Sequence, residues 1–167
     1  MGAKTIVFSH GKDSEPWGTK ILALAEVARA AGWQVESVDY RGIESVEGRL
    51  SKLLDACRDL PPHPVLVGSS LGGYLAVAAS KPVQASGLFL MAPAFDLPGL
   101  PPTSSPQPCP TVVVHGWRDD IVPVEKGLAF AELQRALVHL VDDDHRLHAS
   151  LPRIVGWLRD FLGALHA

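Results

Sequence analysis

Residues 65–73 decide the fold, and they read VLVGSSLGG. The stretch begins as a short apolar, β-branched run, which is typical of a buried parallel strand. Gly68, Ser70 and Gly72 then fit the pattern Gly-x-Ser-x-Gly, in which a sharp turn from strand to helix exposes a serine hydroxyl at the end of a sheet. The two glycines let the strand and the helix cross closely. The stretch therefore predicts a nucleophilic Ser70, and the alternative is a Gly/Ser turn that only packs a helix on a strand.

Strand-like and helical patterns alternate on both sides of this stretch, which indicates a parallel sheet covered on both faces. The pattern predicts one α/β domain over residues 1–167, a three-layer α/β/α sandwich with six parallel strands. Strands are expected at 5–9, 33–39, 65–70, 87–91, 111–115 and 137–141. Helices are expected at 17–31, at 46–59, from 71 to just before Pro82, and at 149–165. A further helix is expected after the fifth strand, with Pro123 as its first residue. Residues 92–110 contain seven prolines and are expected to be irregular.

Composition excludes several other classes of protein. The formal net charge is −3 and no Lys/Arg cluster forms a stripe, so nucleic acid is not expected as a partner. Cys57 and Cys109 are not spaced as a metal site, and neither a metal nor a cofactor is expected. No apolar run is long enough to cross a bilayer, and the N-terminus lacks the features of a signal peptide. We expect a cytoplasmic protein that acts on a small molecule away from membranes, with its oligomeric state open.

A serine hydroxyl needs a neighbouring base, and in a parallel sheet that base lies at the carboxyl ends of the strands. His145 follows the sixth expected strand in a loop that can reach Ser70, and it is the predicted base. His148, at the start of the last helix, is the alternative. His10 and His115 also end strands, but a histidine placed there before a glycine more often holds a loop by hydrogen bonds.

The base in turn needs a carboxylate to orient it. Asp119 lies in the turn after the fifth strand and is the predicted acid. Asp120, which also suits the N-terminus of a helix, and Asp96, in the irregular segment, are the alternatives. Two backbone N–H groups are needed for the oxyanion, and we expect them from Leu71 and from Lys12 in the loop after the first strand.

Taken together, these residues resemble the α/β-hydrolase family. The resemblance rests on the His-Gly loop at residues 10–12, the elbow at 68–72, and the segment HGWRDDIVP at 115–123, in the family's order of serine, aspartate and histidine. It implies the strand order 2-1-3-4-5-6 and an acyl-enzyme formed from an ester or thioester. The family's leading antiparallel strands are absent, and residues 92–110 leave no room for a cap. The chain is therefore similar to the small lidless members, close to the dienelactone-hydrolase-like and small carboxylesterase groups, with serine where a dienelactone hydrolase has cysteine.

The loops at the same edge supply apolar candidates for an acyl pocket, namely Trp17, Phe95 and Trp117. Without a lid the pocket is expected to be shallow. The sequence thus predicts a serine esterase for carboxylic esters with short to medium acyl chains. An acyl thioesterase with the same mechanism and a non-catalytic interaction protein on a hydrolase scaffold are the alternatives. A nucleotide-binding domain is disfavoured because the first loop lacks the phosphate-binding glycine spacings.

Overall fold

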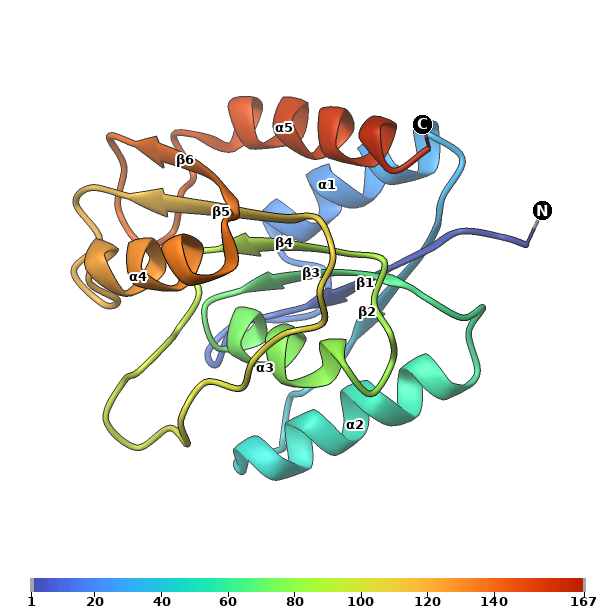
Figure 1. Cartoon of the computed structure of the whole chain (residues 1–167), viewed down its shortest axis with the longest axis horizontal. Coiled ribbons are helices and arrows are strands. Elements are labelled where there is room, and N and C mark those ends of the chain that lie inside the picture. Colours follow the sequence, from blue (N-terminus) through green and yellow to red (C-terminus); the bar gives the residue numbers. More distant parts are fainter. Residues whose placement is uncertain (1, 167) are drawn as a thin grey trace.

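The computed structural model describes residues 2–166, and its centre is a parallel sheet of six strands (Figure 1). The strands follow one another in space in the order β2-β1-β3-β4-β5-β6, and every neighbouring pair is parallel. This is the order that the family resemblance implied, so that expectation is confirmed. The strands are β1 (Thr5–Ser9), β2 (Gln34–Val38), β3 (Val65–Ser69), β4 (Gly87–Met91), β5 (Thr111–Gly116) and β6 (Leu137–Val141).

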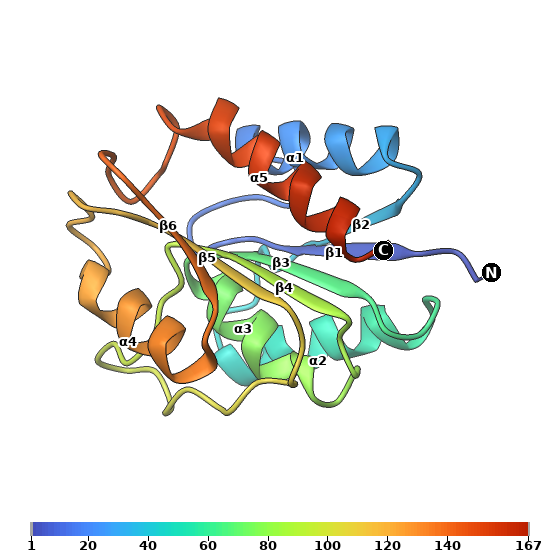
Figure 2. The same ribbon diagram turned by 45° about the horizontal axis from the view of Figure 1, so that its top comes forward.

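Helices cover both faces of the sheet, as the alternating pattern predicted. Helices α1 (Thr19–Ala30) and α5 (Leu151–Ala164) lie on one face (Figure 2). Helices α2 (Val46–Arg58), α3 (Leu71–Ser80) and α4 (Val124–Gln134) lie on the other. One apolar cluster lies between the sheet and α1 and α5, and a second lies between the sheet and α2, α3 and α4. The molecule therefore has three layers.

Local signals set the ends of the helices to within two residues of the expected bounds. Ser45 caps α2 by accepting a hydrogen bond from Gly48 N at 3.0 Å. Gly32 follows α1 with a φ of 84°, a conformation that favours glycine. Three starts differ from the prediction, and α5 begins at Leu151 rather than at residue 149. Helix α1 begins at Thr19 because Gly18 is extended, and Pro123 is the N-cap of α4 rather than its first residue.

The strands in the middle of the sheet are more deeply buried than the edge strand β6. Every residue of β1 and β4 is buried, whereas only Val141 is buried in β6, which pairs with β5 alone. Residues 92–110 form no helix or strand and run as one long loop from β4 to β5 (Figure 1). They build no lid, as expected.

Candidate active site

Ser70 occupies the turn between β3 and α3 in a backbone conformation that side chains rarely adopt. Its φ is 54° and its ψ is −121°, which costs on the order of 1–3 kcal/mol for a residue other than glycine. Hydrogen bonds on both sides hold the turn. Ser70 N donates to Met91 O at 3.0 Å, and Ser70 O accepts from Ala94 N at 3.0 Å. The rest of the structure thus maintains the strained turn that exposes the hydroxyl.

The two glycines of the elbow have the steric role predicted for them. A Cβ atom at Gly72 would overlap the carbonyl group of Ser9 in β1. A Cβ atom at Gly68 would overlap the carbonyl oxygen of Gly72. Since both obstacles are backbone atoms, no side-chain movement would relieve either overlap. Helix α3 therefore crosses the sheet at a distance that only glycine allows.

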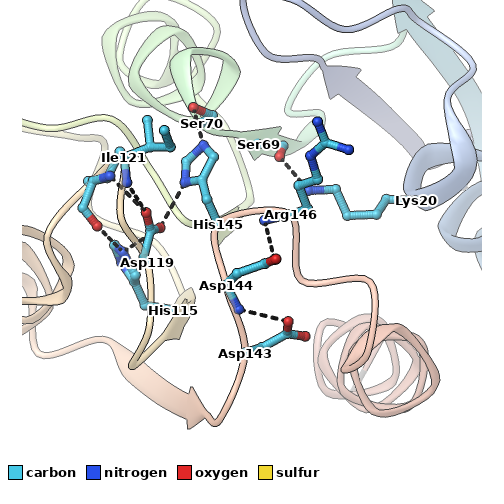
Figure 3. Close-up of polar contacts among 11 residues, drawn as sticks. Lys20, Ser69, Ser70, His115, Asp119, Ile121, Asp143, Asp144, His145 and Arg146 are labelled. Carbon is cyan, nitrogen blue, oxygen red and sulfur yellow. Dashed lines mark hydrogen bonds and ion pairs between the residues drawn. The ribbon is translucent and has the colours of Figure 1, made fainter.

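A continuous chain of hydrogen bonds joins Ser70 to His145 and Asp119 (Figure 3). His145 Nδ1 lies 2.7 Å from Asp119 Oδ2, and His145 Nε2 lies 2.9 Å from Ser70 Oγ. A carboxylate only accepts, so the Nδ1–H group donates to Asp119. The neutral imidazole then has a free lone pair on Nε2, which accepts from the Ser70 hydroxyl. This is the tautomer that a base for the serine requires.

The side chain of Asp119 is held by the backbone of the residues that follow it. Its side chain is fully buried, and its Oδ1 accepts from Ile121 N at 2.9 Å and from Val122 N at 2.8 Å. Its Oδ2 is left to face His145, and it also lies 3.1 Å from His115 Nε2. The carboxylate is therefore oriented by the backbone before it meets the base.

The loop that carries His145 is held by the acidic residues before it. Asp143 is 4% exposed and accepts from Asp144 N at 2.7 Å and from Ser150 N at 2.8 Å. Burial acts to raise the pKa of Asp143, but these hydrogen bonds outweigh it and the pKa lies below its ordinary value. Asp144 in turn accepts from Arg146 N at 2.9 Å. The two carboxylates thus shape the turn on both sides of His145 (Figure 3).

The loop after β1 is arranged so that the Lys12 N–H is free. His10 Nδ1 donates to Gly11 O at 2.8 Å, while His10 Nε2 accepts from Tyr40 N at 3.0 Å. In a planar trans peptide the N–H points opposite to the C=O, so the Lys12 N–H points away from His10. Burial lowers the pKa of His10, which favours the neutral ring that these two bonds require. Within residues 2–166, Lys12 N has no hydrogen-bond partner.

The other side of the same loop is fixed by a buried arginine. Arg49 is 6% exposed, and its Nη2 donates to Lys12 O at 3.2 Å while its Nε donates to Ile43 O at 2.8 Å. The second predicted oxyanion donor, Leu71 N, belongs to the first residue of α3, where N–H groups have no partner within the helix. A Cβ atom at Gly11 would lie 3.5 Å from Ser70 Cβ, so the β1–α1 loop runs directly beside the serine.

The alternatives left open by the sequence are not joined to this chain of hydrogen bonds. Asp96 and Asp120 are exposed, and neither contacts a histidine in the described part of the chain. His148 is exposed at the approach to α5. His10 and His115 are both buried and bonded within loops, as expected of histidines that hold loops.

The three apolar candidates for an acyl pocket differ in their exposure to solvent. Trp17 is 38% exposed and Trp117 is 56% exposed, so both are accessible from solvent. Phe95 is only 1% exposed, and its ring packs 4.3 Å from that of Phe130 in the core. The ring of Phe95 is therefore not accessible from solvent, because Phe130 of helix α4 covers it. Ile121, which no sequence pattern marks as a pocket residue, is 60% exposed two residues after Asp119.

Lys20 is a second residue that sequence reasoning missed. It lies in the first turn of α1, and its Nζ donates to Ser69 Oγ at 3.0 Å, next to the elbow (Figure 3). Burial lowers the pKa of Lys20 to about 8, although Asp143 and Asp144 act in the opposite direction. No sequence signal points to this pair, because a lysine in a helix usually faces solvent.

Two hollows lie away from this site. One of about 370 Å³ is bounded by residues 105–109 and the end of α4, and one of about 360 Å³ lies between β2 and α2. Neither is lined by Ser70, Asp119 or His145. Among residues 2–166, no helix has the length and apolar character needed to cross a membrane. In the same range, no three His, Cys, Asp or Glu side chains are grouped to hold a metal ion.

Comparison with known proteins identifies the family and the fold of the chain. A family model described as the alpha/beta hydrolase family matches residues 6–166. Two curated relatives, both named palmitoyl-protein thioesterase ABHD10, mitochondrial, come from Homo sapiens and Bos taurus and are each 26% identical to this chain. The human match covers 96% of this chain and 73% of the relative. The bovine match covers 76% of this chain, and the chain spans 60% of the length of that relative.

Among solved structures, an alpha/beta superfamily protein from Xanthomonas campestris pv. campestris is 34% identical, with a TM-score of 0.90. That match covers 96% of this chain and 99% of the other. The mouse alpha/beta hydrolase domain-containing protein 10 has a TM-score of 0.81 at 24% identity, over 99% of this chain and 92% of the other. At that identity the likeness shows the fold alone.

Proposed function

This chain belongs to the alpha/beta hydrolase family, and from that premise we propose that it is a serine hydrolase that cleaves carboxylic esters with short to medium acyl chains. Ser70 is the nucleophile, His145 the general base and acid, and Asp119 the residue that orients His145. The observation that carries the proposal is the unbroken chain of hydrogen bonds from Ser70 Oγ through His145 to Asp119 Oδ2, at 2.9 and 2.7 Å. These distances are within the reach needed for proton transfer.

The reaction proceeds in two halves. Ser70 Oγ attacks the acyl carbon while its proton passes to His145 Nε2, and the acyl oxygen becomes an oxyanion held by the N–H groups of Leu71 and Lys12. The bond to the leaving group breaks, and the leaving group takes the proton from His145. Water then attacks the acyl-enzyme with the same help from His145, and Ser70 departs with its proton restored.

The surroundings of Ser70 support an open acyl site. Trp117 and Ile121 are exposed on the loop that carries Asp119, and neither hollow described above reaches the serine. An acyl chain is therefore expected to lie along exposed apolar side chains rather than in a deep tunnel. Such a surface buries only part of a long chain, which favours short and medium chains.

Acyl thioesters are the second candidate class of substrate, because the curated relatives are named palmitoyl-protein thioesterases. A thioester needs the same nucleophile, base and oxyanion donors, so the site accommodates either leaving group. The compartment stays a prediction. The sequence favours the cytoplasm, whereas the names of the curated relatives assign those proteins to mitochondria.

The test combines covalent labelling with matched pairs of substrates. The wild-type protein is expected to react with a fluorophosphonate probe and to hydrolyse p-nitrophenyl butyrate, and Ser70→Ala to lose both. The neighbouring Ser69→Ala serves as the matched control, because Ser69 Oγ is bonded to Lys20 rather than to the base. Butyryl and palmitoyl groups are each presented as a p-nitrophenyl ester and as a coenzyme A thioester. Equal turnover by wild type and Ser70→Ala would refute the proposal.

A further inference from the structure

A second histidine lies against Asp119, on the side away from Ser70. His115 is in β5, and its side chain is 1% exposed. Its Nε2 atom lies 3.1 Å from Asp119 Oδ2 and 3.0 Å from Val122 O. Both neighbours are acceptors, so Nε2 must carry a hydrogen; it donates this hydrogen to Val122 O, and Asp119 Oδ2 lies in polar contact with the same N–H group.

The other nitrogen of this ring fixes the tautomer. His115 Nδ1 is buried and has no hydrogen-bond partner within residues 2–166. A hydrogen on Nδ1 would be a buried donor without an acceptor, which is costly, whereas a bare lone pair there is tolerated better. Helix α4 also passes close to this edge of the ring, because a Cβ atom at Gly127 would overlap Nδ1. The ring is therefore held in the Nε2–H form and cannot tilt toward α4.

With His115 included, four N–H groups face the Asp119 carboxylate, two at each oxygen. Oδ1 accepts hydrogen bonds from two backbone N–H groups, Oδ2 accepts one from His145, and the Nε2–H group of His115 makes a close polar contact with Oδ2 at 3.1 Å. The two donors on Oδ1 set the plane of the carboxylate only in part. The partial positive charge of the second N–H group beside Oδ2 attracts this oxygen, and so opposes rotation of the carboxylate away from the base.

We propose that His115 is a positioning residue, whose Nε2–H group holds Asp119 Oδ2 where it meets the Nδ1–H of His145. This role rests on the proposed function, since it acts through Asp119 on the base. His115 is fully buried, touches no substrate and takes no proton in the reaction. Its contribution is to keep the Asp119–His145 hydrogen bond aligned while His145 gains and loses a proton.

Two amide variants separate the position of the N–H from the mere presence of a polar side chain. The amide of His115→Gln reaches the place of Nε2, whereas the shorter amide of His115→Asn reaches only the place of Nδ1. We expect His115→Asn to lower kcat by about 10- to 100-fold, the scale of one lost polar contact with a charged group. KM should stay within about threefold, because no substrate contact changes. His115→Gln should recover kcat to within about fivefold of wild type.

A third variant guards against loss of folding. His115→Phe keeps a ring packed beside Gly127 and removes the N–H group. Circular dichroism shows which variants are folded, and any folded His115→Phe or His115→Asn protein should show the same loss of kcat. Folded His115→Asn or His115→Phe with kcat within threefold of wild type would overturn the proposal. An equal loss in His115→Gln would overturn it too, because the ring and not its Nε2–H would then matter.

One measurement needs no variant. A long-range ¹H–¹⁵N correlation spectrum of the wild-type protein reports which ring nitrogen carries the hydrogen. We expect His115 to carry it on Nε2 with Nδ1 bare, and the reverse assignment would overturn the proposal. If Ser70→Ala remains active, the proposed function fails instead. If Ser70→Ala is inactive but the three His115 variants are not impaired, only the positioning role fails.

Discussion

Replacing Asp119 by asparagine tests the centre of the site, because the amide is nearly isosteric with the carboxylate but carries two hydrogens. All four partners of Asp119 are donors: two backbone N–H groups on Oδ1 and two histidine N–H groups on Oδ2. In place of Oδ1, the NH₂ group of the asparagine faces two backbone donors; in place of Oδ2 it faces the two histidines, and His145 can accept from it by moving its hydrogen from Nδ1 to Nε2. The second arrangement is the less costly one in this fully buried position, because only the contact with His115 becomes repulsive.

The expected losses follow from this count. An interaction with a charged group contributes about 1.5–3 kcal/mol, so losing one destabilises the protein by about 1.5–3 kcal/mol. For a chain of this length that lowers the melting temperature by about 3–12 °C. The activity should fall by about 10⁴-fold in kcat, because an amide favours the wrong tautomer of the base.

The assay measures p-nitrophenyl butyrate turnover and thermal unfolding of wild type, Asp119→Asn and Asp120→Asn. Asp120 is the matched control because it has the same chemistry one residue later but is exposed, so its variant should change stability by less than about 0.5 kcal/mol. Folded Asp119→Asn with kcat within tenfold of wild type would refute the reasoning. So would an equal loss in Asp120→Asn.

Three further substitutions test the elbow, the oxyanion loop and the buried lysine. Gly72→Ala should destabilise the protein by about 3 kcal/mol, measured by urea unfolding, because the new Cβ meets the carbonyl of Ser9; unchanged stability would contradict this. Gly11→Ala should fold normally, because its Cβ lies 3.5 Å from Ser70 Cβ, an ordinary contact, yet lose tenfold or more in kcat as the methyl group narrows the space beside the hydroxyl. Since the folded-state pKa of Lys20 is lowered to about 8, the unfolded chain binds more protons between pH 8 and 10.5, and wild-type stability gains with pH across that window. Lys20→Met should therefore be more stable than wild type at pH 7, with a difference that shrinks toward pH 10.5; a constant difference would show that the lysine charge is not responsible.

The sequence predicted most of the fold because its signals are local. Hydrophobic periodicity, prolines and Gly32 placed each strand and helix to within two residues of its position. The strand order is not local, and it followed only from the family resemblance. Ser70, Asp119 and His145 were named from the sequence because each follows a strand, and parallel strands bring their carboxyl ends to one edge.

Contacts between distant side chains account for what the sequence did not predict. Phe95 lies in a proline-rich loop and looked accessible, but the chain turns at Asp96, with a φ of 50°, and the ring meets Phe130 of α4. Lys20 reaches Ser69 across 49 positions, and neither residue carries a pattern that marks the pair. His115 was recognised as a loop-holding residue, but its contact with Asp119 depends on side-chain geometry that spacing does not fix.

The position of β6 at the edge of the sheet affects how the protein loses activity at low concentrations of denaturant. The nucleophile stands on β3, which has a strand on each side, whereas the base follows β6, an edge strand with one neighbour and a single buried residue. Regions with few buried contacts open at lower free energy than the core. The edge can thus fray while the centre of the sheet stays intact. Enzymatic activity then depends on an edge strand that opens before the core does. We expect the activity to be lost at denaturant concentrations that leave the circular dichroism signal almost unchanged.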